Sequence, residues 1–219
     1  MMRTKIGYHR GEVMRITFLG HAAFLLEGSI RIYVDPYHLK GNLPEADVIL
    51  ITHPHFDHCS GDDVIRIATE RTKIFAPKGC KVGFSVSIVE PNSTYQWNNA
   101  TIQTVPAYNV GKNFHPPENK WVGYVVNLDG VRIYHAGDTD LIDEMRNIQT
   151  DIALLPVGGT YTMDVSEAVR AAEIIKPRVA VPMHYGDVVG SRNDALNFCA
   201  RCPVECKVLE PYEPWEVKF

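Results

Sequence analysis

The feature that constrains this chain most is a short run of potential metal ligands, the sequence THPHFDH at residues 52–58. It directly follows the apolar run at residues 48–51, which is typical of a buried strand. His53 and His55 are two residues apart, so in an extended loop their side chains point to the same side and can share one cation. The run therefore predicts a metal-binding loop at the carboxyl end of a buried strand.

The same run offers two more ligands, Asp57 and His58, which suit a second cation close to the first. Imidazole nitrogen and carboxylate oxygen favour Zn²⁺, with Mn²⁺ or Fe²⁺ as alternatives. The competing interpretation is a histidine-rich surface loop without a function. Four candidate ligands in a short run behind a buried strand favour the metal site, with one or two ions per chain.

The size and charge of the chain limit its function class. With 219 residues, 45% of them hydrophobic, it is expected to form a single domain with a substantial core, spanning residues 14–219 after a polar N-terminal extension, residues 1–13. A net charge of −4 offers no basic surface for a nucleic-acid backbone, so nucleic acid is disfavoured as a partner. The sequence has no apolar run of membrane-spanning length and no signal-peptide pattern, which predicts a cytoplasmic protein without a membrane anchor.

The five cysteines are an odd number, which favours a reducing compartment over a disulfide framework. Cys199, Cys202 and Cys206 lie close together in the sequence, but no fourth metal ligand is near them. We therefore expect them to be free thiols in the core. Cys59, next to His58, is expected to point away from the metal.

Hydrophobic periodicity predicts short strands up to residue 34, a helix at residues 61–70, and further strands between residues 73 and 105. A hairpin is expected at residues 121–134, because Asp129-Gly130 is a strong two-residue turn signal. The second half alternates helices and strands. Helices are expected at residues 141–148, 164–176 and 194–201, and strands at residues 152–156 and 179–181. This pattern alone indicates only an α/β or α+β fold.

The sequence HPHFDH at residues 53–58 matches the HxHxDH signature of the metallo-β-lactamase fold superfamily, which this chain resembles. Four further segments occur in the order that the superfamily uses: FLGHA at residues 18–22, VDP at 34–36, HAGDT at 135–139 and MHYG at 183–186. From about Met14 to its end, the chain looks like the branch of small single-domain hydrolases that includes L-ascorbate-6-phosphate lactonase. The resemblance implies an α+β fold, a four-layer αββα sandwich.

The resemblance also implies a division of the ligands between two ions. One ion would take His53 and His55, and the other Asp57, His58 and His184, with Asp138 shared by both. The family pattern places a further histidine near residues 106–109, where this chain has Tyr108 and Asn109.

Three readings of this departure stay open: His115 substitutes for the missing histidine, Tyr108 binds through its oxygen, or the first site is weak and often empty. The metal count and the metal preference depend on which reading holds.

Other residues have candidate roles in catalysis. Asp57 would orient the nucleophile as well as hold a metal, and Tyr185, His21 or a protonated water would serve the leaving group. His21 is equally well explained as a residue close to the metal centre, where it would support a ligand or act in catalysis, or as a structural histidine. The turn with Gly158, Gly159 and Thr160 is a candidate substrate loop that would offer backbone donors to an anion.

These expectations lead to a metal-dependent hydrolase that acts on a lactone, phosphoester or related bond of a small molecule. The alternative is a catalytically degenerate member of the same fold. It would be a metal- or ligand-binding protein that acts through a homo-oligomer or another partner.

Overall fold

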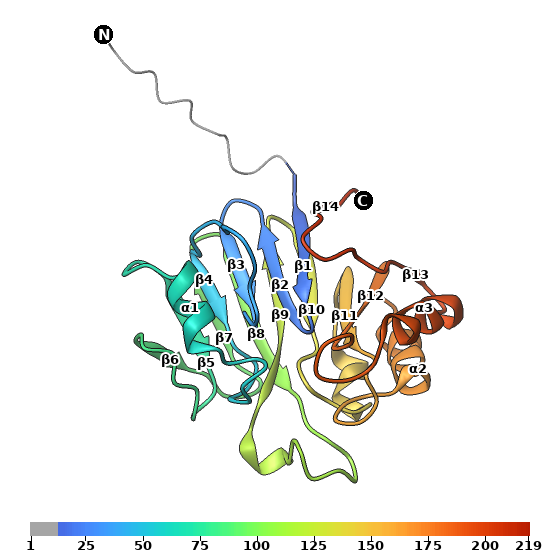
Figure 1. The fold of residues 1–219 in the computed structure, drawn as a ribbon. Coiled ribbons are helices and arrows are strands. Elements are labelled where there is room, and N and C mark those ends of the chain that lie inside the picture. The colour runs from blue at the N-terminus through green and yellow to red at the C-terminus, as the bar shows by residue number, and fades with distance from the viewer. Residues whose placement is uncertain (1–12) are drawn as a thin grey trace.

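The computed structural model describes residues 13–219, which form two mixed β-sheets packed face to face (Figure 1). The predicted extension at residues 1–13 lies almost wholly outside the described residues. The first sheet contains β1 (Arg15–Gly20), β2 (Ala23–Glu27), β3 (Arg31–Val34), β4 (Val48–Leu50), β5 (Lys73–Ala76), β6 (Val86–Ile88) and β14 (Trp215–Glu216). The second contains β7 (Thr94–Trp97), β8 (Ala100–Pro106), β9 (Val122–Leu128), β10 (Val131–His135), β11 (Ile152–Pro156), β12 (Val179–Met183) and β13 (Glu205–Cys206).

Each sheet has an antiparallel half and a parallel half. The first runs in the order β14-β1-β2-β3-β4-β5-β6 and becomes parallel from β3 onwards. The second runs in the order β13-β12-β11-β10-β9-β8-β7 and is parallel from β10 to β13. Parallel neighbours end at the same edge of a sheet, so the loops after these strands are brought close together.

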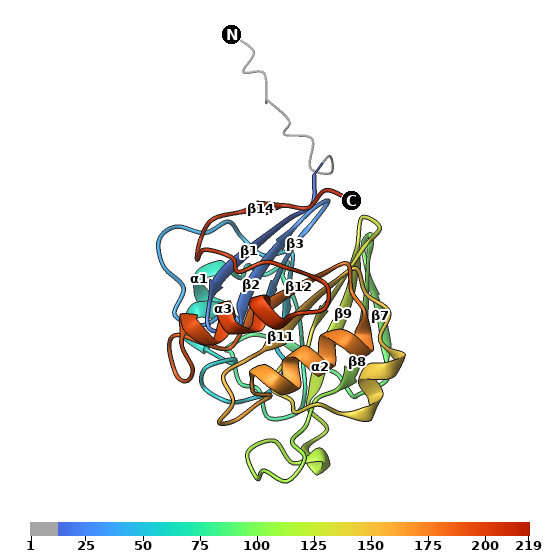
Figure 2. The ribbon, with the colours of Figure 1, turned by 90° about the vertical axis from the view of Figure 1, so that its right-hand side faces the viewer.

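Helices cover the outer faces of both sheets (Figures 1 and 2). Helix α1 (Gly61–Ile67) packs Val64 and Ile67 into an apolar cluster on the first sheet. Helices α2 (Val165–Ile175) and α3 (Arg192–Arg201) contact β11 and β12 of the second sheet. The predicted four-layer αββα sandwich is therefore confirmed.

Local signals account for several boundaries. The predicted hairpin is present as β9 and β10, and both turn residues have positive φ, 51° at Asp129 and 87° at Gly130. Helix α2 begins at the predicted capping box, in which Asp164 accepts from the Glu167 amide.

Three predicted helices differ from the structure. Helix α1 ends at Ile67 because the next residue, Ala68, is extended. The helix predicted at residues 141–148 is the 3-10 helix η2 (Asp143–Asn147), and a second short one, η1 (Pro117–Asn119), lies in the loop after β8. Helix α3 starts two residues before the predicted position, because Ser191 and Asp194 form a capping box.

The prediction of free thiols is wrong for two cysteines. Cys199, in the last turn of α3, forms a disulfide with Cys206 of β13, where the two Cα atoms lie 5.1 Å apart. Helix α3 and the short strand that follows it bring the two residues together, which their spacing in the sequence does not reveal. Cys202 is free, and Cys59 packs near Cys80. Because two cysteines form a disulfide, the odd number of cysteines no longer favours a reducing compartment.

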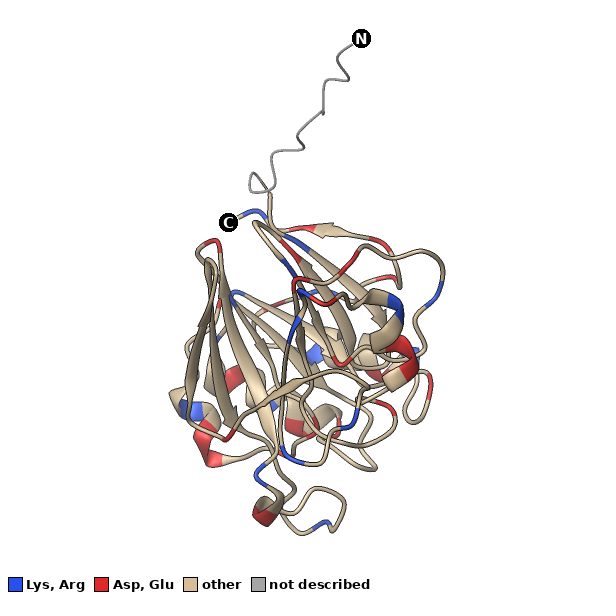
Figure 3. Cartoon of the chain, turned by 90° about the vertical axis from the view of Figure 1, so that its left-hand side faces the viewer, with Lys and Arg blue, Asp and Glu red and all other residues tan. Residues whose placement is uncertain are grey.

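Charged residues of both signs are interspersed along the chain (Figure 3). That nucleic acid is disfavoured as a partner stays a prediction. Within residues 13–219, no helix combines the length and apolar character needed to cross a membrane.

Candidate metal centre

The predicted ligands follow the carboxyl ends of three strands. The loop with His53 and His55 follows β4, Asp138 follows β10, and His184 comes directly after β12. The carboxyl ends of strands at which an open sheet changes direction commonly carry the functional site. The fold thus brings all seven side chains predicted as metal ligands into adjoining groups.

The first group, group 1, consists of His53, His55 and His115, with one ligand-type atom of each within 4.8 Å of the others. Nε2 of His53 lies 3.1 Å from Nδ1 of His55, and the ring centroids of His55 and His115 are 4.9 Å apart. The Trp121 ring contacts all three imidazoles. His53 and His115 are buried, whereas His55 is partly exposed.

The second group, group 2, consists of His21, Asp57, His58 and His184, all of them buried. His21 Nε2 lies 3.1 Å from Asp57 Oδ2, and the His21 and His184 ring centroids are 4.1 Å apart. His21 thus lies in group 2 itself, where it can act as a fourth ligand or as a partner of Asp57.

Asp138 lies between the two groups. Its Oδ2 is 3.0 Å from His184 Nε2 and 3.2 Å from His115 Nε2, while its Oδ1 is 3.2 Å from His58 Nε2. This carboxylate therefore contacts both groups at once, as a ligand shared by two cations would.

The donor atoms fit metal ions. Among the described residues, the buried polar atoms without a hydrogen-bond partner include Nε2 of His58, His115 and His184 and Oδ1 of Asp138. Leaving such atoms unsatisfied costs roughly 1–3 kcal/mol each. Divalent cations satisfy nitrogen and carboxylate donors of this kind, and the side chains around them suit two ions.

Asp35 supports group 2 through hydrogen bonds. This role was not predicted from the sequence. Its carboxylate accepts hydrogen bonds from the Thr52 amide (2.7 Å), the Thr52 hydroxyl (2.6 Å) and His58 Nδ1 (2.7 Å). That contact turns His58 Nε2 towards Asp138, which is how carboxylates commonly orient metal-binding histidines. The position of Asp35 just after β3 was the sequence signal from which this role could have been predicted.

Tyr108 and Asn109 stand where the family pattern has a histidine, and their contacts show what each of them does. The Tyr108 hydroxyl donates to Glu144 and takes no part in either group. Asn109 Oδ1 lies 3.0 Å from the amide nitrogen and 3.1 Å from Nδ1 of His115, and so turns His115 Nε2 towards Asp138. Of the three alternatives, the geometry favours substitution by His115.

Charge in the site follows from burial and proximity. Burial by itself would raise the pKa of Asp138, but His184 and His58 outweigh it and hold that pKa well below its usual range. Burial also opposes the charged form of His58, yet Asp138 and Asp35 raise its pKa to about 9. Burial lowers the pKa of His53 well below its usual value, and the positive charge of His58 lowers it further. Without metal the centre thus combines an ionised Asp138, a neutral His53 and a protonated His58, and a cation bound by His58 would take the place of that proton.

Backbone strain occurs where the two sheets meet at the centre. His21 and His184 both adopt positive φ, 51° and 59°, and the His184 amide donates to the His21 carbonyl at 2.6 Å. Such conformations are unfavourable for residues other than glycine and persist where surrounding structure enforces them. Here they aim both imidazoles into group 2.

Two other predicted site features, the turn at residues 158–160 and Tyr185, belong to neither ligand group. The amides of Gly159 and Thr160 already donate to the carbonyls of Met163 and Gly158, so they are not free to bind an anion. Gly158 instead allows close packing, since a Cβ there would lie 2.5 Å from the His184 carbonyl oxygen. Tyr185 lines a pocket beside the centre and belongs to neither ligand group.

A pocket of about 240 Å³ opens onto both groups. Its lining residues are His55, Phe56, Asp57, Phe114, His115, Asp138, Tyr161 and Val188. The side chains of Phe56 and Phe114 are 66% and 46% exposed, so an apolar rim surrounds the entrance. We refer to this pocket as the mouth.

The family model for the β-lactamase superfamily domain matches residues 15–184. The chain is 40% identical to a UPF0173 metal-dependent hydrolase of Thermococcus kodakarensis, over 94% of this chain and 100% of the relative. It is 35% identical to one of Archaeoglobus fulgidus, over 93% and 99% of the two chains.

The chain belongs to the UPF0173 family of the β-lactamase superfamily. The solved structure of Igni18, a metallo hydrolase of Ignicoccus hospitalis, superposes with a TM-score of 0.77 at 27% identity, covering 95% of this chain and all of that one. The prediction of a metal-dependent hydrolase is confirmed by this membership. The family name specifies no substrate, so the resemblance to a lactonase stays a prediction.

Proposed function

We propose that this UPF0173 member is a hydrolase with two metal ions, which cleaves an ester-type bond, in a lactone or a phosphoester, of a small molecule. The observation that carries the proposal is the position of Asp138, which contacts both ligand groups through a single carboxylate. His53, His55 and His115 would hold one ion, and Asp57, His58 and His184 the other. The nitrogen-rich donor set suits Zn²⁺ best, with Mn²⁺ or Fe²⁺ as alternatives.

Cations bound here would supply an acidified water as the nucleophile and positive charge to stabilise the developing oxyanion. The protein would contribute orientation and proton handling. Asp57 faces the mouth, and its hydrogen bond with His21 contributes to lowering its pKa although burial would raise it, so it stays ionised and can accept a hydrogen bond from the attacking water.

His21 would steady Asp57 and would take up the proton that the attacking water passes to the Asp57 carboxylate. Burial lowers the pKa of His21, so its imidazole is largely neutral near pH 7 and available for this task. The Tyr185 hydroxyl faces another pocket and is not assigned to the leaving group.

The degenerate, non-catalytic alternative rested on a missing third histidine. His115 lies beside His53 and His55, which supports the hydrolase over this alternative, and no separate observation favours the alternative.

Elemental analysis combined with hydrolysis assays tests the proposal. Purified protein should contain two ions per chain and hydrolyse a neutral lactone such as dihydrocoumarin or a diester such as bis-p-nitrophenyl phosphate. Chelation should abolish turnover, and Zn²⁺ or Mn²⁺ should restore it. His55→Ala should lose metal and activity, whereas His38→Ala, at a more exposed histidine outside both groups, should keep the metal. Full metal content without turnover of any ester, lactone or diester would contradict the proposal.

A further inference from the structure

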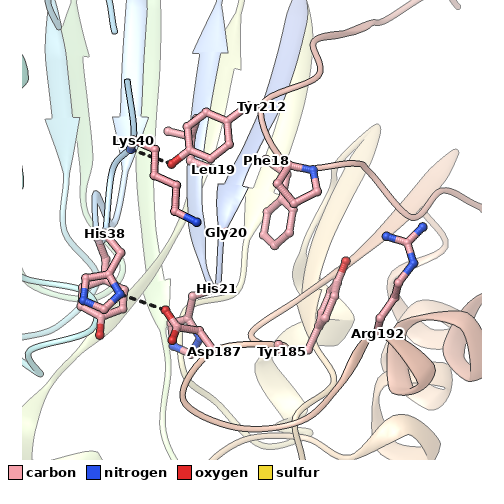
Figure 4. Close-up of a pocket in the computed structure, with 13 residues that line it drawn as sticks. Phe18, Leu19, Gly20, His21, His38, Lys40, Tyr185, Asp187, Arg192 and Tyr212 are labelled. Atoms are coloured by element: carbon pink, nitrogen blue, oxygen red, sulfur yellow. Dashed lines mark hydrogen bonds and ion pairs between the residues drawn. The ribbon is translucent and has the colours of Figure 1, made fainter. Parts of the chain in front are cut away.

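A second pocket, larger than the mouth, lies beside the metal centre (Figure 4). Its volume is about 420 Å³, within the range of roughly 300–1,000 Å³ that is typical of small-molecule sites. Four separate segments build it: the end of β1, the loop after β3, the segment from β12 to α3, and the C-terminal stretch around Tyr212. We refer to it as the side pocket.

The side pocket and the mouth share no lining residue. The boundary between the side pocket and the metal centre is His21, which lines the side pocket and also hydrogen-bonds Asp57 of group 2. Nδ1 of His21 is buried and has no hydrogen-bond partner. A ligand here would therefore lie one side chain away from the centre without entering the mouth.

The polar groups of the side pocket suit an anion. The amine of Lys40 points into it and has no ion pair within the described part of the chain (Figure 4). Arg192 stands on the opposite side, where it pairs with Glu210. The other charged groups that face the space, His38 and Asp187, bond to each other at 3.1 Å. Lys40 is thus the cation left available to a ligand.

Phenol groups add hydrogen-bond donors. The Tyr212 hydroxyl accepts the Lys40 amide at 2.9 Å, which leaves its own proton free to donate. The Tyr185 hydroxyl points along the pocket away from His21 (Figure 4). Burial raises the pKa of both tyrosines, so both stay protonated at neutral pH.

The walls of the side pocket are aromatic. The rings of Phe18 and Tyr185 stack with centroids 5.7 Å apart, and Tyr37 and Tyr212 line other sides. Aromatic faces favour a planar ring by offset or edge-to-face contact.

We propose that the side pocket is a second ligand site, for a small aromatic compound that carries a phosphate, phosphonate or carboxylate group. Lys40 and Tyr212 bind the anionic group, and the ring lies against Tyr185 and Phe18. Binding of a ligand here does not require the hydrolytic reaction proposed for the metal centre. Its ligand is either the remote part of a substrate or a separate compound, which share this chemistry.

Calorimetric titration with phenylphosphonate, which cannot be hydrolysed, tests the site. The wild-type protein should bind it, and Lys40→Met should raise the Kd about tenfold, as expected for loss of a charge-assisted bond. Tyr212→Phe should raise it by a smaller factor. Lys78→Met, at another exposed lysine outside the pocket, is the matched control and should leave the Kd unchanged.

Binding must also survive removal of the metal ions by a chelator, because the side pocket contains no member of the two groups except His21. An equal Kd for Lys40→Met and Lys78→Met, loss of binding on chelation, or absence of binding to the wild-type protein would each overturn the proposal. None of these results would bear on hydrolysis, which is measured separately.

Two further results identify the source of the ligand. Competitive inhibition of hydrolysis by phenylphosphonate, with lost affinity in Lys40→Met, supports a substrate part in the pocket. Binding that leaves the KM unchanged supports a separate compound.

Discussion

The two ligand groups of the centre are built in different ways. Group 2 is buried, although Asp57 lines the mouth: His184 directly follows β12, and Asp35 fixes His58 from behind. Group 1 borders the mouth, with a partly exposed His55, and it depends on His115 from the long loop after β8. A site on strand ends is held more rigidly than a site on a loop. We therefore expect group 2 to bind its ion more tightly, and group 1 to exchange its ion more readily.

Loss of Asp138 should weaken metal binding in both groups, because its carboxylate contacts both of them. We expect Asp138→Asn to weaken both sites and to reduce kcat/KM by more than about 100-fold, beyond the usual effect of residues that only orient ligands. Metal content and hydrolysis measure this. Asp151→Asn, at a carboxylate that bonds the Arg132 amide on β10, should keep both, and normal turnover by Asp138→Asn would refute a shared ligand.

His115→Ala should affect metal binding in group 1 and leave group 2 unchanged. It removes one ligand from group 1 only, so the metal content should fall from two ions per chain towards one while the fold is kept. Tyr108→Phe is the matched control, since its hydroxyl bonds Glu144 and neither group. Elemental analysis of both variants decides the matter. If Tyr108→Phe lost the ion and His115→Ala kept it, the assignment of the third ligand would be wrong.

Asp35→Asn should act on group 2 from a distance. The amide cannot hold His58 Nδ1 as the carboxylate does, so the affinity of group 2 should fall by about 10–100-fold, with group 1 little changed. Titration against a competing chelator measures the two affinities. Asp63→Asn changes another buried carboxylate, one that accepts the His38 and Leu39 amides, and it should change stability without this loss of affinity.

The pH dependence of the metal-free protein tests the charge on His58. Its pKa is raised to about 9 in the folded chain, so its contribution to stability is complete below its unfolded value of about 6.5 and is lost as the pH rises through 9. We expect the free energy of unfolding of chelated protein to fall by up to roughly 3 kcal/mol across this window. Urea denaturation at several pH values measures it. A flat profile, or the same slope in Asp35→Asn, would contradict the pairing.

The sequence allowed the ligands near strand ends to be predicted in both groups, but it left the loop ligand of group 1 open. The signature at residues 53–58 and the segments containing Asp138 and His184 lie at strand ends, where short-range patterns carry the information. His115 lies in a loop whose path depends on long-range contacts, so local spacing left its role open. The shortened α1 and the Cys199–Cys206 disulfide were missed for the same reason, because tertiary packing decides both.

A substitution at Asn109 has the smallest expected effect, and it tests whether a site on a loop is held less rigidly than a site on strand ends. Asn109→Ser removes the acceptor that holds His115, and also the bonds from Nδ2 to Asp140 and to the Tyr161 carbonyl. The loop should loosen, and the affinity of group 1 should fall by about tenfold, at the low end of the effect of orienting residues. Excess metal should restore kcat, because His115 itself is retained.

The control for this last prediction is Asn119→Ser, at an exposed asparagine of the same loop. It should leave the affinity unchanged. An equal loss in both variants would mean that the whole loop, rather than the hydrogen bond from Asn109, positions His115. A loss in neither would mean that group 1 is as rigid as group 2, and the difference in metal exchange between the groups would then have to come from the exposure of His55 alone.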